Sequence, residues 1–127
     1  MKYLLLLLLL VLPITVFALE NTNKEGECLN ANKSITVKSC LIVHGIGTDA
    51  EYVELNFSKK VFFIEKPMIC YNTECDVRLG NQFNQLKVAE VYYLSEKNKK
   101  KTTRLVGKYW TCYKQIDGKI NVCYREK

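Results

Sequence analysis

The chain has 127 residues, of which 48% are hydrophobic and 25% charged, with six cysteines and a formal net charge of +6. A chain of this length without a long linker corresponds to one domain rather than several. One histidine and no Cys-x-x-Cys pair disfavour a zinc site.

The first residues, MKYLLLLLLLVLPITVFALE, have the pattern of a secretory signal peptide. Lys2 supplies the positive charge, an apolar run follows, and VFA before residue 19 is a suitable cleavage site. A membrane anchor, the alternative, needs about 20 apolar residues, whereas this run is shorter and contains Pro13. We therefore expect removal of residues 1–18, leaving residues 19–127 as one secreted or periplasmic domain.

Apolar residues recur at every second position from residue 35 onward, which is the period of a β-strand. The alternation is clear in ITVKSCLIVH and YVELNFS, and similar runs follow in KVFFIE, LKVAEVYYL, TRLVGKYWTCYK and KINVCYR. Short strands separated by Asn, Gly, Asp and Lys turns predict a single antiparallel all-β domain, either a sandwich or a half-open barrel. Residues 19–34 are polar and are expected to form a loose segment held at Cys28.

The C-terminal stretch WTCYKQIDGKINVC predicts a disulfide-stapled hairpin. Asp117-Gly118 is a type I′ turn signal, because both positions of that turn need positive φ. With these two residues as the loop, Cys112 lies directly opposite Cys123, at about 5.5 Å between Cα atoms if the pair is hydrogen-bonded. Disulfide geometry accepts this separation, so we predict a bond between them.

The remaining cysteines can be paired by similar reasoning. A two-residue loop at 72–73 places Cys70 opposite Cys75, which leaves Cys28 for Cys40. An even number of cysteines in a short exported chain is typical of a disulfide framework. We predict the pairs 28–40, 70–75 and 112–123.

His44 is the only histidine, and it is the one candidate for catalysis. With a carboxylate such as Asp49 or Glu51 it could form an acid–base pair, as in a small basic nuclease or toxin. The sequence shows no nucleophile, paired base or metal-ligand set around it. We therefore expect His44 to be structural and the protein not to be an enzyme.

Charge is unevenly distributed along the chain. Residues 19–96 contain 8 Lys/Arg and 11 Asp/Glu, whereas residues 97–127 contain 10 Lys/Arg and 2 Asp/Glu. The C-terminal part thus has a net charge of +8, which favours an acidic partner, although a solvated basic hairpin is the simpler alternative.

A turn at Asn98-Lys99 would place Tyr93 on the same sheet face as Trp110 and the cystine, with Tyr113 and Tyr124 on the opposite, core face. Basic groups interleaved with aromatic rings suit polyanions or an acidic protein groove. Alternatively, Trp110 packs beside the cystine in the core, and only the lysine tip is left for binding. The predicted binding residues are Lys97, Lys99, Lys100, Lys101, Arg104, Lys108, Trp110 and Arg125.

These features favour a non-enzymatic binding protein without a cofactor or metal. Its size, cystines and strands are typical of inhibitor and immunity proteins that neutralise another protein, here an acidic protein partner or another polyanion. The alternatives are a nuclease-like enzyme that uses His44, and a module for anionic glycans, lipid headgroups or nucleic acid. Asn32 and Asn56 would be glycosylation acceptors only in a eukaryote.

Overall fold

The structure, a computed structural model, describes residues 22–32, 36–70, 75–103, 105 and 107–127. The predicted signal peptide and the predicted loop at 72–73 lie outside this part of the chain. The described residues form eight strands: β1 (Thr22–Asn30), β2 (Lys38–Ile46), β3 (Ala50–Phe57), β4 (Lys60–Pro67), β5 (Arg78–Gly80), β6 (Lys87–Ser95), β7 (Tyr109–Gln115) and β8 (Asn121–Glu126). Among the described residues, no helix has the length and apolarity needed to span a membrane.

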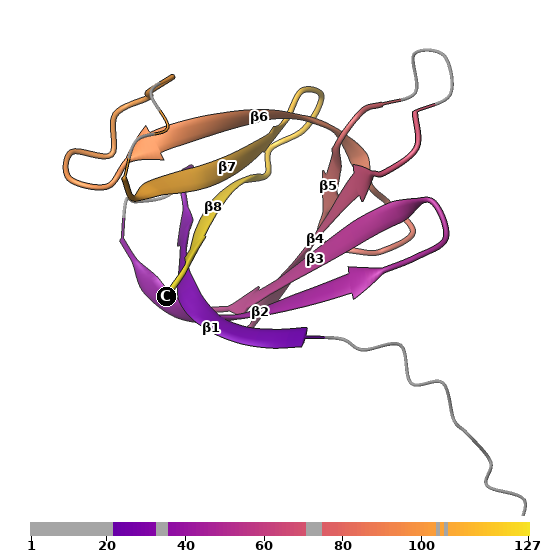
Figure 1. The fold of residues 1–127 in the computed structure, drawn as a ribbon, viewed down its shortest axis with the longest axis horizontal. Coiled ribbons are helices and arrows are strands. Elements are labelled where there is room, and N and C mark those ends of the chain that lie inside the picture. The colour runs from indigo at the N-terminus through magenta and orange to yellow at the C-terminus, as the bar shows by residue number, and fades with distance from the viewer. Residues whose placement is uncertain (1–21, 33–35, 71–74, 104, 106) are drawn as a thin grey trace, which may run out of the picture.

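The eight strands form one closed antiparallel barrel in which each strand pairs with its neighbours in the sequence (Figure 1). The predicted single antiparallel all-β domain is confirmed, and the barrel is closed rather than half-open. Closure is made by β1, which pairs with β2 on one side and with β8 on the other. A closed sheet leaves no free edge for pairing with another chain.

The expectation of a loose N-terminal segment is wrong for residues 22–30. Gly26 faces Cys40 on β2 and Glu126 on β8, so this polar segment is a central element of the sheet. A Cβ atom at Gly26 would lie 2.4 Å from the Ile42 side chain, so a larger residue does not fit without movement. The pairing comes from two distant strands, which a local pattern does not reveal.

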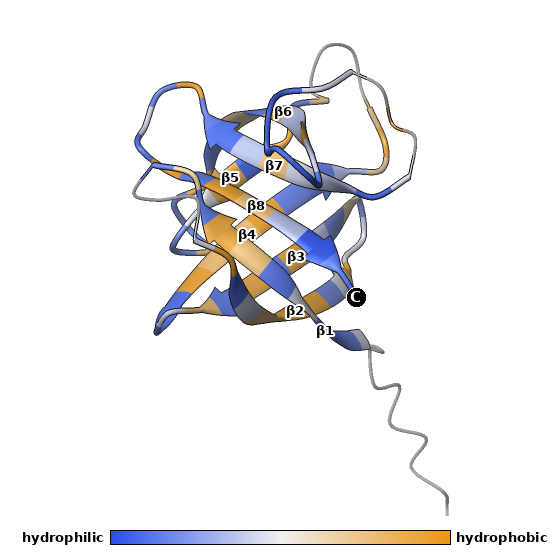
Figure 2. Ribbon diagram, turned by 90° about the vertical axis from the view of Figure 1, so that its left-hand side faces the viewer, coloured by the Kyte–Doolittle hydropathy of each residue, from blue (hydrophilic) through white to orange (hydrophobic). Residues whose placement is uncertain are grey.

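The lumen of the barrel is filled by side chains from alternate positions of all eight strands. This arrangement follows from the two-residue period of a strand, which sends successive side chains to opposite faces. Figure 2 shows the resulting mixture of apolar and polar positions along each strand. The buried lumen cluster contains Cys28, Cys40, Ile42, Val53, Leu55, Phe57, Phe62, Ile64, Leu79, Ala89, Tyr113, Val122 and Tyr124.

A second, smaller apolar cluster lies on the outer face of the barrel wall, where β1, β6, β7 and β8 run side by side. Trp110 is its largest member, and the Cys112–Cys123 bond lies next to it. Tyr92 packs against its edge from β6. The fully or nearly fully buried members are Leu29, Leu94, Trp110, Cys112 and Cys123.

All three predicted disulfides are present. Cys112 and Cys123 are directly opposite in the ladder between β7 and β8, with 4.0 Å between their Cα atoms. Cys28–Cys40 joins β1 to β2 inside the lumen, and Cys70–Cys75 closes a short segment between β4 and β5. The described residues contain no free cysteine.

The turn between β7 and β8 has the predicted register but not the predicted type. Neither Asp117 nor Gly118 has positive φ, and the strands are joined by a wider loop in which the Gln115 N–H donates to the Ile120 carbonyl. Gly118 serves close packing instead, because a Cβ there would lie 2.2 Å from the side-chain oxygen of Gln115. The loop is centred at the same point, so the cysteines still face each other.

The positive-φ hairpin occurs between β3 and β4. Ser58 and Lys59 have φ values of 53° and 59°, and Phe57 pairs with Lys60 across them. This is the geometry of a two-residue type I′ turn. Ser-Lys lacks the Asn or Gly that usually marks such a turn, so the sequence did not identify it.

The predicted register between β6 and β7 is wrong. The structure pairs Leu94 with Trp110, whereas a turn at Asn98-Lys99 would have paired Tyr93 with Arg104. The chain instead makes a long loop from Glu96 to Lys108 before β7 begins. Because side chains alternate, the error reverses the faces of β6: Tyr92 packs outside, and Tyr93 has the lumen orientation.

Candidate functional site

One end of the barrel carries most of the residues that the sequence predicted as a site. The first residues of β1, the β2–β3 turn, the β6–β7 loop and the last residues of β8 lie here, because antiparallel neighbours alternate in direction. The start of β1 and the C-terminus mark this end on the right of Figure 2. Val91 has the lumen orientation of its partner Tyr113 yet is 39% exposed, so water reaches the lumen here. We call it the open end.

His44 lies in a polar cluster at the open end. Its Nε2 is 2.5 Å from Oε1 of Glu126, and its Nδ1 is 3.6 Å from Oε1 of Glu51. The other carboxylate oxygen of Glu126 accepts a hydrogen bond from Lys24 at 3.3 Å. The cluster therefore links β1, β2, β3 and β8 across the seam that closes the barrel.

This geometry limits what His44 can do. Nε2 of His44 is within hydrogen-bond distance of Glu126, whereas Nδ1 lies near Glu51 but beyond that distance. A general acid or base needs a nitrogen that faces the reacting group, whereas both nitrogens of His44 face side chains of the protein. The carboxylate Glu51, considered in the sequence as a partner, is therefore near His44, together with Glu126, which was not considered.

The pKa of Glu126 is lowered from its usual value. Burial acts to raise this pKa, but hydrogen bonds from His44 and Lys24, together with their positive charges, more than offset it. Hydrogen bonds that favour the ionised form of a carboxyl group lower its pKa. Glu126 thus stays ionised and holds the two cationic side chains of β1 and β2 against β8.

A lysine and two tyrosines lie deeper in the lumen. Lys66 donates a hydrogen bond of 3.3 Å to the hydroxyl oxygen of Tyr124. Its ammonium is 5.7 Å from the ring centroid of Tyr113 and 6.0 Å from that of Tyr124, and the two rings are stacked 6.1 Å apart. Burial raises the pKa of Tyr113 far above its usual value, with Tyr124, Tyr93 and Glu51 contributing.

The basic β6–β7 loop, residues Glu96–Lys108, folds back onto the end of β6. The N–H of Lys99 donates to the Ser95 carbonyl, and the N–H of Ser95 donates to the Lys100 carbonyl. Farther along, the N–H of Thr102 donates to the Tyr93 carbonyl, and the backbone of Lys101 forms a bridge with Leu94. These bonds give the first half of the loop a defined backbone.

The lysines of this loop extend into solvent. Lys97, Lys100 and Lys108 are exposed and Lys99 is half-buried, and none of these four ammonium groups forms an ion pair with another described residue. Lys101 is also exposed, with its ammonium 5.0 Å from the ring centroid of Tyr92. Arg104, another predicted binding residue, lies outside the described part.

Trp110 and Arg125 occupy a different environment from the lysines. Trp110 is 1% exposed, so the alternative in which it packs beside the cystine is the one observed. Arg125 lies over its ring and makes ion pairs with Glu27 at 2.7 Å and with Glu96 at 3.0 Å. Two hydrogen bonds of Arg125 to one oxygen of Glu27 add to this contact. Both residues support the loop rather than present a free surface.

Lys24, Lys66 and Glu126 also belong to the open end, although the sequence did not predict them as part of a site. A signal was present for Lys66, since it continues the alternation of Phe62 and Ile64 into the lumen. A charged residue at an inward position of a barrel strand is unusual because its burial is costly. Glu126 carries a similar signal, since it continues the alternation of Val122 and Tyr124, but the sequence does not show which side chains from other strands it meets.

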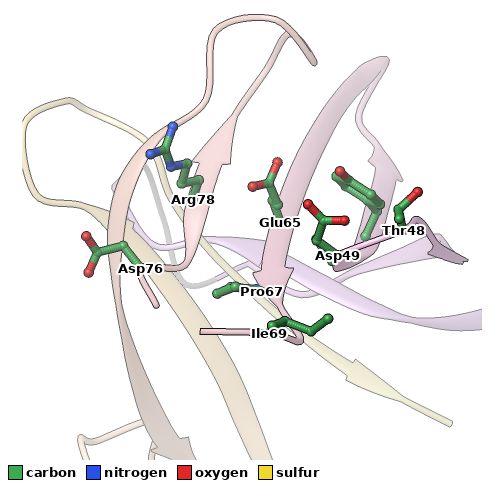
Figure 3. A pocket seen from close by; sticks show the side chains of 9 residues that line it. Thr48, Asp49, Glu65, Pro67, Ile69, Asp76 and Arg78 are labelled. Carbon is green, nitrogen blue, oxygen red and sulfur yellow. The ribbon is translucent and has the colours of Figure 1, made fainter. Parts of the chain in front are cut away.

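Figure 3 shows a second hollow of about 600 Å³, on the outside of β3, β4 and β5. Tyr52, Pro67 and Ile69 form its less polar part, and Arg78 lies across from Glu65 and Asp49. Burial and the charges of Glu65 and Asp49 raise the pKa of Tyr52. The charged groups that line the hollow are one cation, Arg78, and three carboxylates, Asp49, Glu65 and Asp76.

Comparison of the chain with known protein families, curated proteins and solved structures finds no match. Within the described residues, no group of three or more His, Cys, Asp or Glu side chains is arranged to hold a metal ion. The geometry of the open end is therefore the basis for a functional proposal.

Proposed function

We propose that this protein is a secreted or periplasmic binding protein that docks an acidic partner protein through its basic β6–β7 loop, as an inhibitor or immunity protein would. The observation that carries the proposal is a group of lysines that make no ion pair with another described residue, on a loop whose first half has a defined backbone. An unpaired charge on a fixed backbone attracts a complementary surface without first losing an internal ion pair.

The support beneath the loop favours the same conclusion. Arg125 pairs with both Glu96 at the start of the loop and Glu27 on β1, which offsets one of these two negative charges and holds the base of the loop against β1. A loop held in place loses less conformational entropy on binding than a free one. The charge and the rigidity together suit fast, electrostatically steered association.

Three disulfides are compatible with an oxidising compartment, such as the extracellular space or the periplasm. This agrees with the signal-peptide pattern of the sequence. A protein that acts outside the cytoplasm also benefits from crosslinks in a small core.

The nuclease-like alternative has one observation in its favour, the short contact between His44 and Glu126. However, the second carboxylate at His44 leaves no nitrogen directed at a substrate. Assays of nuclease activity on pure protein, with His44→Ala as the matched variant, decide this point. Activity that is lost in His44→Ala, with an unchanged melting curve, would establish the enzyme instead.

The test of docking is affinity capture from the envelope or extracellular fraction of the source organism, with three forms of the mature protein as bait. The first is unchanged, the second carries Lys97→Glu, Lys100→Glu and Lys101→Glu, and the third carries Lys38→Glu, Lys59→Glu and Lys119→Glu. The third set makes the same change of charge at exposed positions at the opposite end of the barrel.

We expect a protein that is retained by the unchanged and third baits, released by salt and not retained by the second. With that protein purified, the loop variant should associate at least about tenfold more slowly, with a weaker dependence on salt. Equal loss with both triple variants would mean that only net charge matters. Retention of nucleic acid, glycan or anionic vesicles in place of a protein would favour the anionic-surface alternative.

A further inference from the structure

The lumen of the open end contains an ammonium group without a counter-ion. Among the described residues, no carboxylate lies within ion-pair distance of Lys66. Glu51 is its direct neighbour on β3, but the contact that Glu51 makes is with His44. A partly buried charge without a counter-ion is costly for a protein. Within the described part of the chain, Lys66 is thus a cation that makes no ion pair.

The groups around Lys66 are arranged as hydrogen-bond donors. Tyr124 accepts a hydrogen bond from Lys66 through its oxygen, so its own O–H is left to donate. Tyr113 lies beside it with its ring stacked on that of Tyr124; burial, and then the interaction with Tyr124 that includes a side-chain hydrogen bond, raise the pKa of Tyr113. An ammonium and a phenol O–H this close together can both donate to one anion, and hydrogen bonds to a charged group are strong.

The barrel wall is incomplete next to this site. The ladder between β4 and β5 ends at Glu65–Arg78, and the ladder between β5 and β6 ends at Arg78–Val88. Lys66 and Val91 lie beyond these last pairs, although Val77, which precedes β5, still accepts a hydrogen bond from the N–H of Ala89 on β6. The 39% exposure of Val91, which has the lumen orientation, shows that this part of the lumen is reached from solvent.

We propose that Lys66 and Tyr124 form a lumenal subsite for a single carboxylate group. Lys66 would supply the compensating charge, and Tyr124 would donate a hydrogen bond to the second carboxylate oxygen. Lys24 and His44, in the polar cluster nearby, already contact the carboxylates of Glu126 and Glu51.

A monoanion fits this site better than a phosphate dianion. Among the described cations of the lumen at this end, Lys66 is the one without an ion pair, and Glu51 is close enough to raise the pKa of Tyr113. A second negative charge would therefore meet repulsion without gaining a partner. The carboxylate has two sources, a small free acid or an acidic side chain of the docked partner. The second source rests on the proposed function and the first does not.

Sodium acetate is the probe, with sodium phosphate for comparison, both at constant ionic strength. The measurement is NMR of the mature protein labelled with ¹³C in its lysine and tyrosine side chains. Acetate should shift the resonances of Lys66, Tyr113 and Tyr124 along a saturating curve, with a dissociation constant on the order of 10 mM for so small a ligand. Phosphate should bind at least about fivefold more weakly. The absence of a saturating shift at Lys66, or equal shifts at exposed Lys114, would overturn the subsite.

Two variants separate the site from a general effect of charge. Lys66→Met should abolish saturable binding, whereas Lys114→Met, which removes one exposed charge from β7, should leave it intact. Tyr124→Phe keeps the ring and should weaken acetate binding about fivefold, the equivalent of one hydrogen bond. It serves as the test if Lys66→Met does not fold. Unchanged acetate affinity in Tyr124→Phe would also contradict the proposal.

The loop variant distinguishes the two sources of the carboxylate. Reversal of Lys97, Lys100 and Lys101 should leave acetate binding at Lys66 unchanged, because these residues lie outside the lumen. If Lys66→Met weakens binding of the captured partner about tenfold or more, the carboxylate comes from the partner. If it leaves partner binding unchanged while acetate binding is lost, the subsite serves a small acid. Failure of docking alone would not affect the acetate result.

Discussion

The guanidinium of Arg125 lies over the indole ring of Trp110, 4.6 Å from its centroid. The same guanidinium bonds Glu27 on β1 and Glu96 at the start of the β6–β7 loop. The Arg125 side chain therefore covers the outer apolar cluster. It also holds β1, the strand that closes the barrel, and the base of the basic loop. The stability of the barrel and the position of the proposed binding element depend on the same contact.

Trp110→Ala should lower the free energy of unfolding by about 3–5 kcal/mol, because it leaves a cavity under Arg125 next to the Cys112–Cys123 bond. Trp110→Phe should cost much less, since most of the volume remains. Urea denaturation followed by circular dichroism measures both. A loss below about 1 kcal/mol for Trp110→Ala would contradict the burial of this side chain.

Arg125→Met should release the base of the β6–β7 loop while keeping an apolar cover over Trp110. Partly exposed ion pairs are each worth about 0.2–1 kcal/mol, so hydrogen exchange at the N–H groups of Lys99 and Thr102 should accelerate about two- to fivefold. The N–H of Ala89, lower on β6, serves as the internal reference and should not change. Uniform acceleration across the barrel would indicate global destabilisation instead.

The three disulfides should differ in their contribution to stability. Replacement of buried Cys112 and Cys123 by alanine should cost about 2–5 kcal/mol. Replacement of Cys70 and Cys75, both exposed, should cost less, because no cavity forms. Thermal unfolding of the two double variants gives the order, and peptide mapping without reduction checks the pairs themselves. A larger cost for the exposed bond would be the contrary result.

Glu126 should make stability depend on pH in the acid range. Its pKa is lower in the folded protein than in the unfolded chain, so its contribution is complete above the unfolded value of about 4.3. The contribution is lost as pH falls through the folded pKa. Glu126→Gln should therefore flatten the fall in unfolding free energy below about pH 4.5, measured by denaturation at a series of pH values. An identical acid profile in the variant would rule out this role.

Local sequence rules determined the fold class, the three disulfide pairs and the register of the C-terminal hairpin. Each depends on features close together in the chain: the two-residue period, and cysteines spaced symmetrically about short turns. The hairpin register was correct although its turn type was not, because a loop centred at the same point pairs Cys112 with Cys123 either way.

Such local rules did not predict the register between β6 and β7. The β6–β7 loop contains several plausible turns, and the one that exists depends on Leu94 and Trp110 meeting in the outer cluster. The sequence alone therefore left open whether Trp110 is exposed, and the structure shows it buried. What remains on the surface is the lysine-rich part of the loop.

Barrel closure and the polar open end were decided only by the tertiary structure. The sequence of β1 is typical of a polar, irregular segment. It forms a strand because its backbone pairs with β2 on one side and with β8 on the other. Closure then brings His44 to Glu126, which are 82 positions apart in the chain, and Lys66 to Tyr124, 58 positions apart. Periodicity predicts which face of a strand a side chain occupies. It does not predict which strand lies across the lumen, because that depends on how the whole sheet curves and closes.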